Sequence, residues 1–246
     1  MIKEAEENWF VDWFNSPFYH DLYRHRDHSE AVRWMHKILE IVPLQKEQAI
    51  LDVCCGNGRH ALCLEKLGYT VYGLDIGVDN IQKAKSNSQF PERWMATDAR
   101  EMQYPLSFQL VTNLFTSFGY FNESNENKKL FLKMLDQVGE RGFFIIDFLN
   151  APKVARDLIP SEEVQGELAE YKISRDIQHR TILKNIDFEY NHHHFSFQEK
   201  VYLYEKSDFL EWINNTSFEL IHHLGDYGAA EYQSDSPRSI FVFQKK

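Results

Sequence analysis

Residues 49–67 constrain the fold more than any other segment of the chain. An apolar run at 49–53 leads into a turn that carries Gly56 and Gly58, and apolar residues at helical spacing follow. Glycines at such a turn let backbone N–H groups approach a ligand closely, and the N-terminus of the following helix favours negative charge. The segment therefore predicts a strand, a ligand-binding turn and a helix, as in a parallel α/β sheet.

Asp52 bears on which ligand this turn holds. It lies four residues before Gly56, and a carboxylate there suits a cationic or hydrogen-bond-donating group better than a pyrophosphate. The same turn, Gly56-x-Gly58-x-x-Ala61, also satisfies the dinucleotide fingerprint. A nicotinamide cofactor therefore stays an alternative to a ligand with a cationic group, and the acidic residues that follow the turn decide between these two ligands.

Acidic residues follow the next two predicted strands. Asp75 closes the segment 69–75, nineteen residues after Gly56, where it can accept the hydroxyls of a ribose in NAD or in S-adenosylmethionine. Asp98 follows a further strand at 93–96. Nicotinamide-binding folds do not require an acid at this second position, whereas an adenine amino group would use it. The two acids together favour S-adenosylmethionine.

Strands and helices alternate from residue 49 to about residue 158. Strands are expected at 49–53, 69–75, 93–96, 108–113 and 142–147, and helices near 59–67, 78–87, 124–137 and 151–158. This alternation is typical of a parallel sheet with helices on both faces. A further helix should begin after Ser29 as its N-cap and end at about Val42, before Pro43. Residues 1–45 are expected to form an N-terminal helical cover.

The pattern changes after residue 160. Apolar residues alternate with polar ones in three runs, which predicts an antiparallel sheet with one face on the core. We place this sheet at 160–204, as an insertion after the fifth strand that roofs the substrate pocket. A short helix at 207–213 follows, and segments 218–221 and 240–243 should close the main sheet as an antiparallel pair. The predicted fold class is α/β, with a Rossmann-like sheet of seven mostly parallel strands.

Composition argues against several function classes. The net charge of −10 and the lack of a long basic stretch disfavour nucleic acids and anionic membranes as partners. No window holds 18 uninterrupted apolar residues, and no signal peptide is expected at the N-terminus. The three clustered cysteines suit reduced thiols in the cytoplasm. His192, His193 and His194 would point to alternating sides of an extended chain, so no metal site is expected.

Segments 51–60, 71–75 and 113–121, together with Asp98, resemble the class I S-adenosylmethionine-dependent methyltransferases, in particular their small bacterial single-domain branch. Segments 225–227 and 236–240 are also similar to that branch. The resemblance implies one methyltransferase domain over 1–246, with S-adenosylmethionine as the cofactor and S-adenosylhomocysteine as its product. It places the methionine moiety at Gly56 and Gly58, the ribose at Asp75 and the adenine amino group at Asp98.

The resemblance also implies further contacts with the cofactor. Arg26 would pair with the methionine carboxylate, and residues 113–115 would line the wall beside the sulfonium. Cys54 departs from the family pattern, because many relatives have a glycine there and a cysteine disfavours positive φ. The residues expected to bind the cofactor are Tyr23, Arg26, Asp52, Cys54, Gly56, Gly58, Asp75, Ile76, Asp98, Ala99, Asn113, Leu114 and Phe115. Those expected to bind the acceptor are Tyr19, Phe118, Tyr120, Asn150, Arg175 and Tyr227.

Chemistry alone assigns no catalytic residue. Methyl transfer from a sulfonium requires mainly that the acceptor is aligned and water excluded. The Asn-Pro-Pro-aromatic signature of enzymes that methylate nucleobase or amide nitrogens is absent at 113–116, and with the acidic charge this favours a small-molecule acceptor. Two alternatives stay open, namely an NAD-dependent oxidoreductase and an S-adenosylmethionine-binding protein without catalysis.

Overall fold

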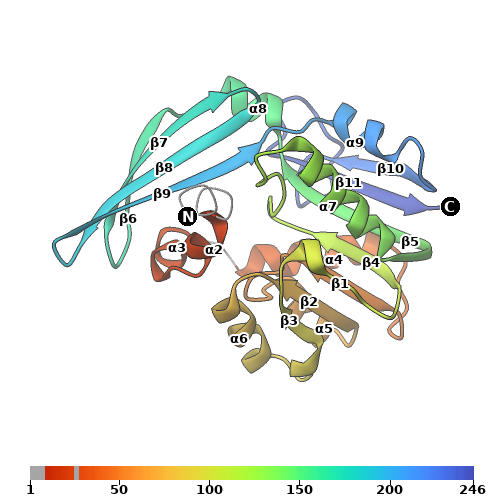
Figure 1. Ribbon diagram of the computed structural model, residues 1–246. Helices are drawn as coiled ribbons and strands as arrows, with labels where there is room; N and C mark the ends of the chain where they lie inside the picture. The colour runs from red at the N-terminus through yellow and green to blue at the C-terminus, as the bar shows by residue number, and fades with distance from the viewer. Residues whose placement is uncertain (1–8, 25–27) are drawn as a thin grey trace.

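The computed structural model describes residues 9–24 and 28–246 of the chain. Its main sheet has seven strands in the order β10-β11-β5-β4-β1-β2-β3 (Figure 1). These are β1 (Ala49–Val53), β2 (Thr70–Asp75), β3 (Trp94–Ala96), β4 (Phe108–Asn113), β5 (Val138–Leu149), β10 (Phe218–Leu224) and β11 (Arg238–Lys245). Strands β1 to β5 pair in parallel, and β11 runs antiparallel to β5 and β10. The predicted mostly parallel sheet is confirmed.

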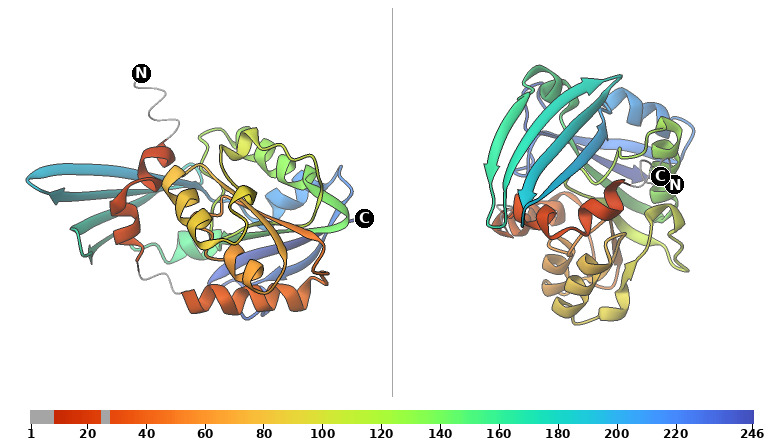
Figure 2. Two further views of the ribbon diagram at one scale, coloured as in Figure 1. Left: turned by 90° about the horizontal axis from the view of Figure 1, so that it is seen from below. Right: turned by 60° about the vertical axis from the view of Figure 1, so that its left-hand side comes forward.

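Helices cover both faces of this sheet (Figure 2). They include α4 (His28–Ile41), α5 (Ala61–Lys66), α6 (Val78–Asn87), α7 (Ser124–Asp136), α8 (Ala151–Arg156) and α9 (Lys206–Ile213). Successive side chains of a strand point to opposite faces. Leu51 of β1 accordingly belongs to the core with α7 and α9, whereas Ile50 belongs to the core with α4, α5 and α6.

The start of α4 differs from the prediction. The helix begins at His28, so Ser29 lies inside it, and the Ser29 hydroxyl accepts a hydrogen bond from Nη1 of Arg33 at 2.8 Å. The end of the helix at Ile41, two residues before Pro43, agrees with the expected stop. Among the described residues, no helix combines the length and the apolar composition needed to cross a bilayer.

A second, antiparallel sheet follows α8 in the order β6-β7-β8-β9. Its strands are β6 (Ser161–Gln165), β7 (Glu170–Gln178), β8 (Thr181–Tyr190) and β9 (His193–Tyr202). Three strands were expected; β6 was missed because Val164 is its only apolar residue. The turn that joins β8 to β9 consists of Asn191 and His192, both at positive φ, while His193 and His194 belong to β9.

The N-terminal helices α2 (Trp9–Phe14) and α3 (Pro17–Leu22) pack against this second sheet (Figures 1 and 2). The two parts share a hydrophobic core of their own, made of Trp13, Phe18, Leu22, Ala169, Tyr171, Ile173, Ile186 and Phe188. The buried carboxylate of Asp21 accepts hydrogen bonds from the backbone N–H groups of Glu167 and Leu168 at 2.8 and 2.9 Å. It also accepts one from the hydroxyl of Tyr171 at 2.8 Å. Asp21 therefore fixes α3 to the loop between β6 and β7.

We expect Asp21→Asn to lower the free energy of unfolding by about 1–3 kcal/mol, because an amide offers one acceptor oxygen to three donors. The measurement is equilibrium chemical denaturation followed by tryptophan fluorescence. Burial raises the pKa of Asp21, but hydrogen bonds from the Tyr171 hydroxyl and from the backbone of residues 167–169 outweigh that effect and lower the pKa below its ordinary value. The stabilisation by Asp21 should therefore be present at neutral pH and decline as the pH falls through that lowered pKa.

Asp136→Asn, at the exposed C-terminal end of α7, is the matched control, with an expected change within about 0.5 kcal/mol. An Asp21→Asn variant as stable as this control would show that Asp21 does not hold the N-terminal helices.

Candidate active site

A cavity of about 490 Å³ lies beyond the carboxyl ends of β1, β2 and β4. The turn after β1, the residues after β2 and β3, and the loop after β4 line one side of it. Helices α2 and α3, the strand β9 and Arg238 at the start of β11 also contribute, as do Asn80 of α6 and Leu130 of α7. Ligand sites of open α/β sheets occur at this edge, where connections diverge from adjacent strands.

The turn after β1 has three residues at positive φ. These are Cys54 at 59°, Gly56 at 57° and Gly58 at 79°. Cys54 thus takes the left-handed conformation that a cysteine was expected to disfavour. A Cβ atom at Gly56 would meet nothing within 4 Å, whereas one at Gly58 would lie 2.8 Å from two ring carbons of Trp94. Gly56 therefore faces open space, and Gly58 is required for packing.

Asp75, at the end of β2, holds this turn. Its Oδ2 accepts a hydrogen bond from the Gly56 N–H at 2.8 Å, and its Oδ1 accepts one from the Gly77 N–H at 2.8 Å. Burial raises the pKa of Asp75 above its ordinary value, although these backbone donors counteract the rise. The carboxylate thereby connects the glycine turn of β1 to the neighbouring strand.

Asp52 is the second buried acid of the cavity wall, with 2% of its surface exposed. Burial raises its pKa to about 7, against the opposing effect of a hydrogen bond from the Thr112 hydroxyl at 2.7 Å. The negative charge of Asp75 adds to the rise, and Arg59 counteracts it. Asp52 therefore titrates near neutral pH.

Asp98, the third acid, is paired. Its Oδ2 lies 2.6 Å from Nη2 of Arg100, and its Oδ1 accepts a hydrogen bond from the Arg100 N–H at 2.8 Å. Burial favours the protonated acid, but the bonds from Arg100 lower the pKa of Asp98 below its ordinary value. The Arg100 guanidinium lies over the ring of Phe121, 4.6 Å from its centroid. Asp98 is therefore ionised at neutral pH.

Cys54 and Cys55 also line the cavity. Burial raises the pKa of both thiols well above the ordinary value, and the charges of Asp52 and Asp75 add to this effect. Because the thiolate is the reactive form, these cysteines are poor nucleophiles and act as small packing residues.

Aromatic side chains of the N-terminal helices and the β4 loop form an aromatic wall of the cavity. Those in the lining are Trp9, Phe10, Phe14, Tyr19, Tyr23, Phe115, Phe118, Tyr120 and Phe121. The ring of Tyr120 has its centroid 5.5 Å from that of Trp9 and 5.6 Å from that of Phe14. The loop after β4 therefore meets the N-terminal helices through aromatic contacts. Trp13 and Phe18, two further aromatic residues of the N-terminal segment, pack instead into the core shared with the antiparallel sheet.

Glu199 of β9 carries a charge into the same wall. Its carboxylate accepts hydrogen bonds from the Tyr23 hydroxyl at 2.7 and 2.8 Å and from Nε1 of Trp13 at 2.7 Å. Lys184 of β8 lies 3.6 Å away, and burial lowers its pKa while Glu199 counteracts that effect. These contacts of Glu199 join the N-terminal helices to the antiparallel sheet at the cavity.

Thirteen of the predicted site residues line the cavity. They are Tyr19, Tyr23, Asp52, Cys54, Gly56, Asp75, Ile76, Asp98, Ala99, Leu114, Phe115, Phe118 and Tyr120. The structure does not place Gly58, Asn113, Asn150, Arg175 and Tyr227 in this lining. Arg26 lies outside the described residues.

The predicted residues outside the lining make polar contacts within the fold, although Oδ1 of Asn113 has no hydrogen-bond partner among the described residues. Asn113 is fully buried and donates to the carbonyl groups of Val53 and Ser117. Arg175 pairs with Glu162 of β6. Tyr227 donates to the carboxylate of Asp147, a buried residue of β5.

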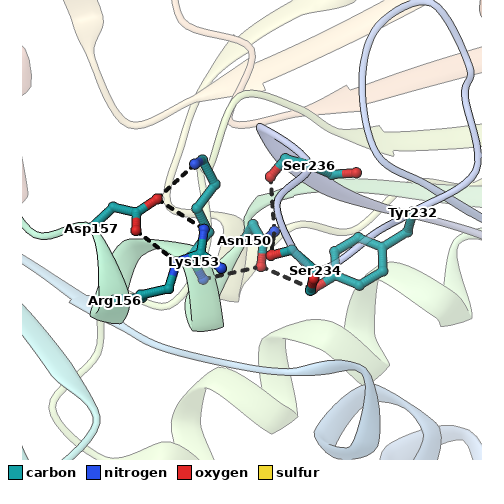
Figure 3. Close-up of polar contacts among 7 residues, drawn as sticks. All are labelled: Asn150, Lys153, Arg156, Asp157, Tyr232, Ser234 and Ser236. Carbon is teal, nitrogen blue, oxygen red and sulfur yellow. Dashed lines mark hydrogen bonds and ion pairs between the residues drawn. The ribbon is translucent and has the colours of Figure 1, made fainter.

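Asn150 is the N-cap of α8, and its side-chain oxygen accepts from the Lys153 N–H at 3.4 Å. Its amide group donates to the carbonyl groups of Ser234 and Ser236, and the Tyr232 hydroxyl donates to its oxygen at 2.9 Å (Figure 3). Asn150 thereby ties α8 to the loop before β11, and its amide is not available for an acceptor.

Sequence reasoning missed several residues of the lining. Arg59 and His60 follow Gly58 directly, so their place just before α5, the helix after β1, could have predicted that they line the cavity. Glu199 and Val201 carry no such signal, because they lie on a strand far along the chain. Among the described residues, no group of three or more His, Cys, Asp or Glu side chains could hold a metal ion.

Comparisons with known proteins agree with this geometry. Residues 50–142 match the family described as "Methyltransferase domain". The chain is 23% identical over 225 residues to a protein of Geobacillus sp. (strain WCH70) that carries the name "Putative methyltransferase", and the match covers 86% of this chain and 90% of that protein.

Solved structures share the fold over nearly the whole chain. An S-adenosylmethionine-dependent methyltransferase from Clostridium acetobutylicum has a TM-score of 0.78 at 17% identity, with 93% of this chain and 96% of that chain covered. The amino pentose methyltransferase CalS10 from Micromonospora echinaspora, solved with S-adenosylmethionine bound, has a TM-score of 0.69 at 19% identity, with 94% and 98% covered. Residues 50–142 thus match a methyltransferase domain, and the fold of the whole chain is that of solved S-adenosylmethionine-dependent methyltransferases.

Proposed function

We propose that the enzyme binds S-adenosylmethionine along the sheet edge and methylates a small molecule held beneath α2, α3 and β9. The observation that supports this most directly is the composition of the cavity. Three acids at strand ends and the aromatic wall formed by the N-terminal helices and the β4 loop line the same cavity. One cavity therefore offers separate places for a polar cofactor and for an acceptor.

The residues present fit the cofactor. The cavity volume of about 490 Å³ lies in the range of roughly 300–1,000 Å³ that is usual for small-ligand pockets. Gly56 leaves open space above the turn, and Oδ1 of the buried lining residue Asn80 has no hydrogen-bond partner among the described residues. A ligand with hydroxyl and amino groups could satisfy that oxygen.

Each acid then has a proposed role. Asp75 would accept the ribose hydroxyls, and Asp98 would accept the adenine amino group. Asp52, beside the glycine turn, would face the cationic part of the methionine moiety. The bound cofactor supplies a methyl group already activated by its sulfonium. The task of the protein is to orient the acceptor and to exclude water, which the aromatic wall serves.

We propose that 1–246 is one methyltransferase domain in which the N-terminal segment up to 45 covers the cofactor and the sheet at 160–204 roofs the acceptor. Glu199 and Val201 of β9 in the lining support the second role, and the Tyr23–Glu199 hydrogen bonds support a joint cover. Tyr19, Phe118 and Tyr120 are the proposed acceptor contacts, and Arg26 remains the candidate partner of the methionine carboxylate.

Two features support the kind of partner and the compartment that we propose. The net charge of −10 supports a small-molecule acceptor rather than a nucleic acid. Cys54, Cys55 and Cys63 are free thiols, and a cytoplasmic location would keep them reduced.

Calorimetric titration tests the cofactor assignment. S-adenosylhomocysteine should bind with a Kd in the micromolar range or below, and NAD should show no saturable heat. Transfer of a radiolabelled methyl group into a metabolite extract then tests catalysis. Saturable binding of NAD without S-adenosylhomocysteine binding would favour the oxidoreductase alternative, and cofactor binding without transfer to any extract would favour a non-catalytic role.

The pKa of Asp52 predicts a pH dependence of cofactor binding. Because an ionised carboxylate attracts the cationic amino group of the ligand, affinity for S-adenosylhomocysteine should rise by up to about tenfold between pH 6 and pH 8. The native state holds the Asp52 proton more tightly than the unfolded chain does. The contribution of Asp52 to stability should therefore be largest below the unfolded pKa of 3.8 and be lost as the pH rises through about 7.

Asp52→Asn is the matched variant for both measurements, because it keeps the side-chain shape and removes the titration. Its binding curve should be flat in this pH range after other titrations are subtracted. An unchanged pH profile in Asp52→Asn would assign the titration to another group.

A further inference from the structure

We propose that Asp147, Arg238 and Tyr227 form a positioning clamp that holds Phe115 and Thr116 in a left-handed turn at the cavity wall. The inference rests on the proposed function, since it concerns the wall beside the bound cofactor. Asp147, the buried acid near the end of β5, would act by positioning other residues and would not contact the ligand itself.

The turn after β4 is strained. Phe115 has φ of 61° and Thr116 has φ of 59°, and both side chains line the cavity. Bulky and β-branched residues rarely adopt this conformation, because the Cβ atom crowds the backbone. Such residues persist only where surrounding contacts hold them, and they concentrate at functional sites. Two in succession therefore require an identifiable restraint.

Asp147 supplies that restraint. Its Oδ2 accepts a hydrogen bond from the Phe115 N–H at 2.8 Å, and its backbone carbonyl accepts one from the Thr116 N–H at 2.9 Å. Asp147 is fully buried and does not line the cavity. Asp147 thus accepts hydrogen bonds from the N–H groups of both Phe115 and Thr116, although it does not itself line the cavity.

Arg238 and Tyr227 complete the clamp. Nε of Arg238 donates to Oδ1 of Asp147 at 2.7 Å, and the Tyr227 hydroxyl donates to Oδ2 at 2.9 Å. Nη2 of Arg238 also donates to the Thr116 hydroxyl at 2.8 Å. A carboxylate removed from water requires such a charged partner. Arg238 is this partner, and its bond to the Thr116 hydroxyl is a second contact with the turn that Asp147 holds.

The clamp fixes the position of an aromatic wall. The Phe115 ring lies 4.5 Å from the guanidinium of Arg59, another lining residue. If the restraint is lost, the backbone of Phe115 and Thr116 relaxes to negative φ, and the ring leaves the wall. The loss should appear as weaker cofactor binding rather than only as lower stability.

The test is the Kd of S-adenosylhomocysteine, measured by calorimetry, together with the melting temperature of each variant. We expect Asp147→Asn to raise the Kd at least tenfold. The matched control is Glu65→Gln, because Glu65 is also a buried carboxylate that accepts from a hydroxyl and a backbone N–H, those of Ser88 and Gln89, but lies outside the cavity lining. The control should leave the Kd within threefold.

Rescue separates positioning from general stability. Thr116→Gly relieves the strain at one of the two residues, since glycine adopts positive φ freely. Added to Asp147→Asn, it should recover at least threefold of the lost affinity without restoring the melting temperature. Should Asp147→Asn fail to fold, Tyr227→Phe, which removes one hydrogen bond to Asp147, should raise the Kd twofold to fivefold.

Three results would overturn the proposal. These are an unchanged Kd in the folded Asp147→Asn or Tyr227→Phe variant, a loss matched by Glu65→Gln, and a loss that Thr116→Gly does not reduce. A wild-type protein that binds no S-adenosylhomocysteine would contradict the proposed function itself, so the two failures are distinguishable.

Discussion

The hydrogen bond from the Gly56 N–H to the carboxylate of Asp75 is the contact on which the site depends. It joins the turn after β1 to the end of β2 at 2.8 Å, while Gly77 holds the other carboxylate oxygen. The turn requires three residues at positive φ, one of them Cys54, so it needs an external partner. With the turn fixed, the acids at the ends of neighbouring strands face one cavity.

The N-terminal helices and the antiparallel sheet also contribute residues to the cavity at the edge of the main sheet. Helices α2 and α3 share a hydrophobic core with the antiparallel sheet rather than with the main sheet, and Asp21 and Glu199 connect the two parts by hydrogen bonds. Segments far apart in the sequence thus share one core and line the cavity together.

The fold could be predicted from the sequence because it rests on local patterns. Apolar runs, glycine turns and period-two alternation located the main strands, and the acids at their ends followed from strand order. β6 was missed because it carries one apolar residue, and Glu199 because no local pattern marks a wall formed from a remote strand. Asn150 and Tyr227 were expected at the acceptor, yet their polar groups form hydrogen bonds within the fold, which only three-dimensional contacts reveal.

A crystal structure of the protein with S-adenosylhomocysteine would show directly where the cofactor binds. We expect the ligand in the cavity at the ends of β1 and β2, with its ribose hydroxyls within hydrogen-bond distance of Asp75 and its adenine amino group near Asp98. An empty cavity at saturating ligand, or a ligand bound elsewhere on the surface, would show that this edge of the sheet does not hold the cofactor.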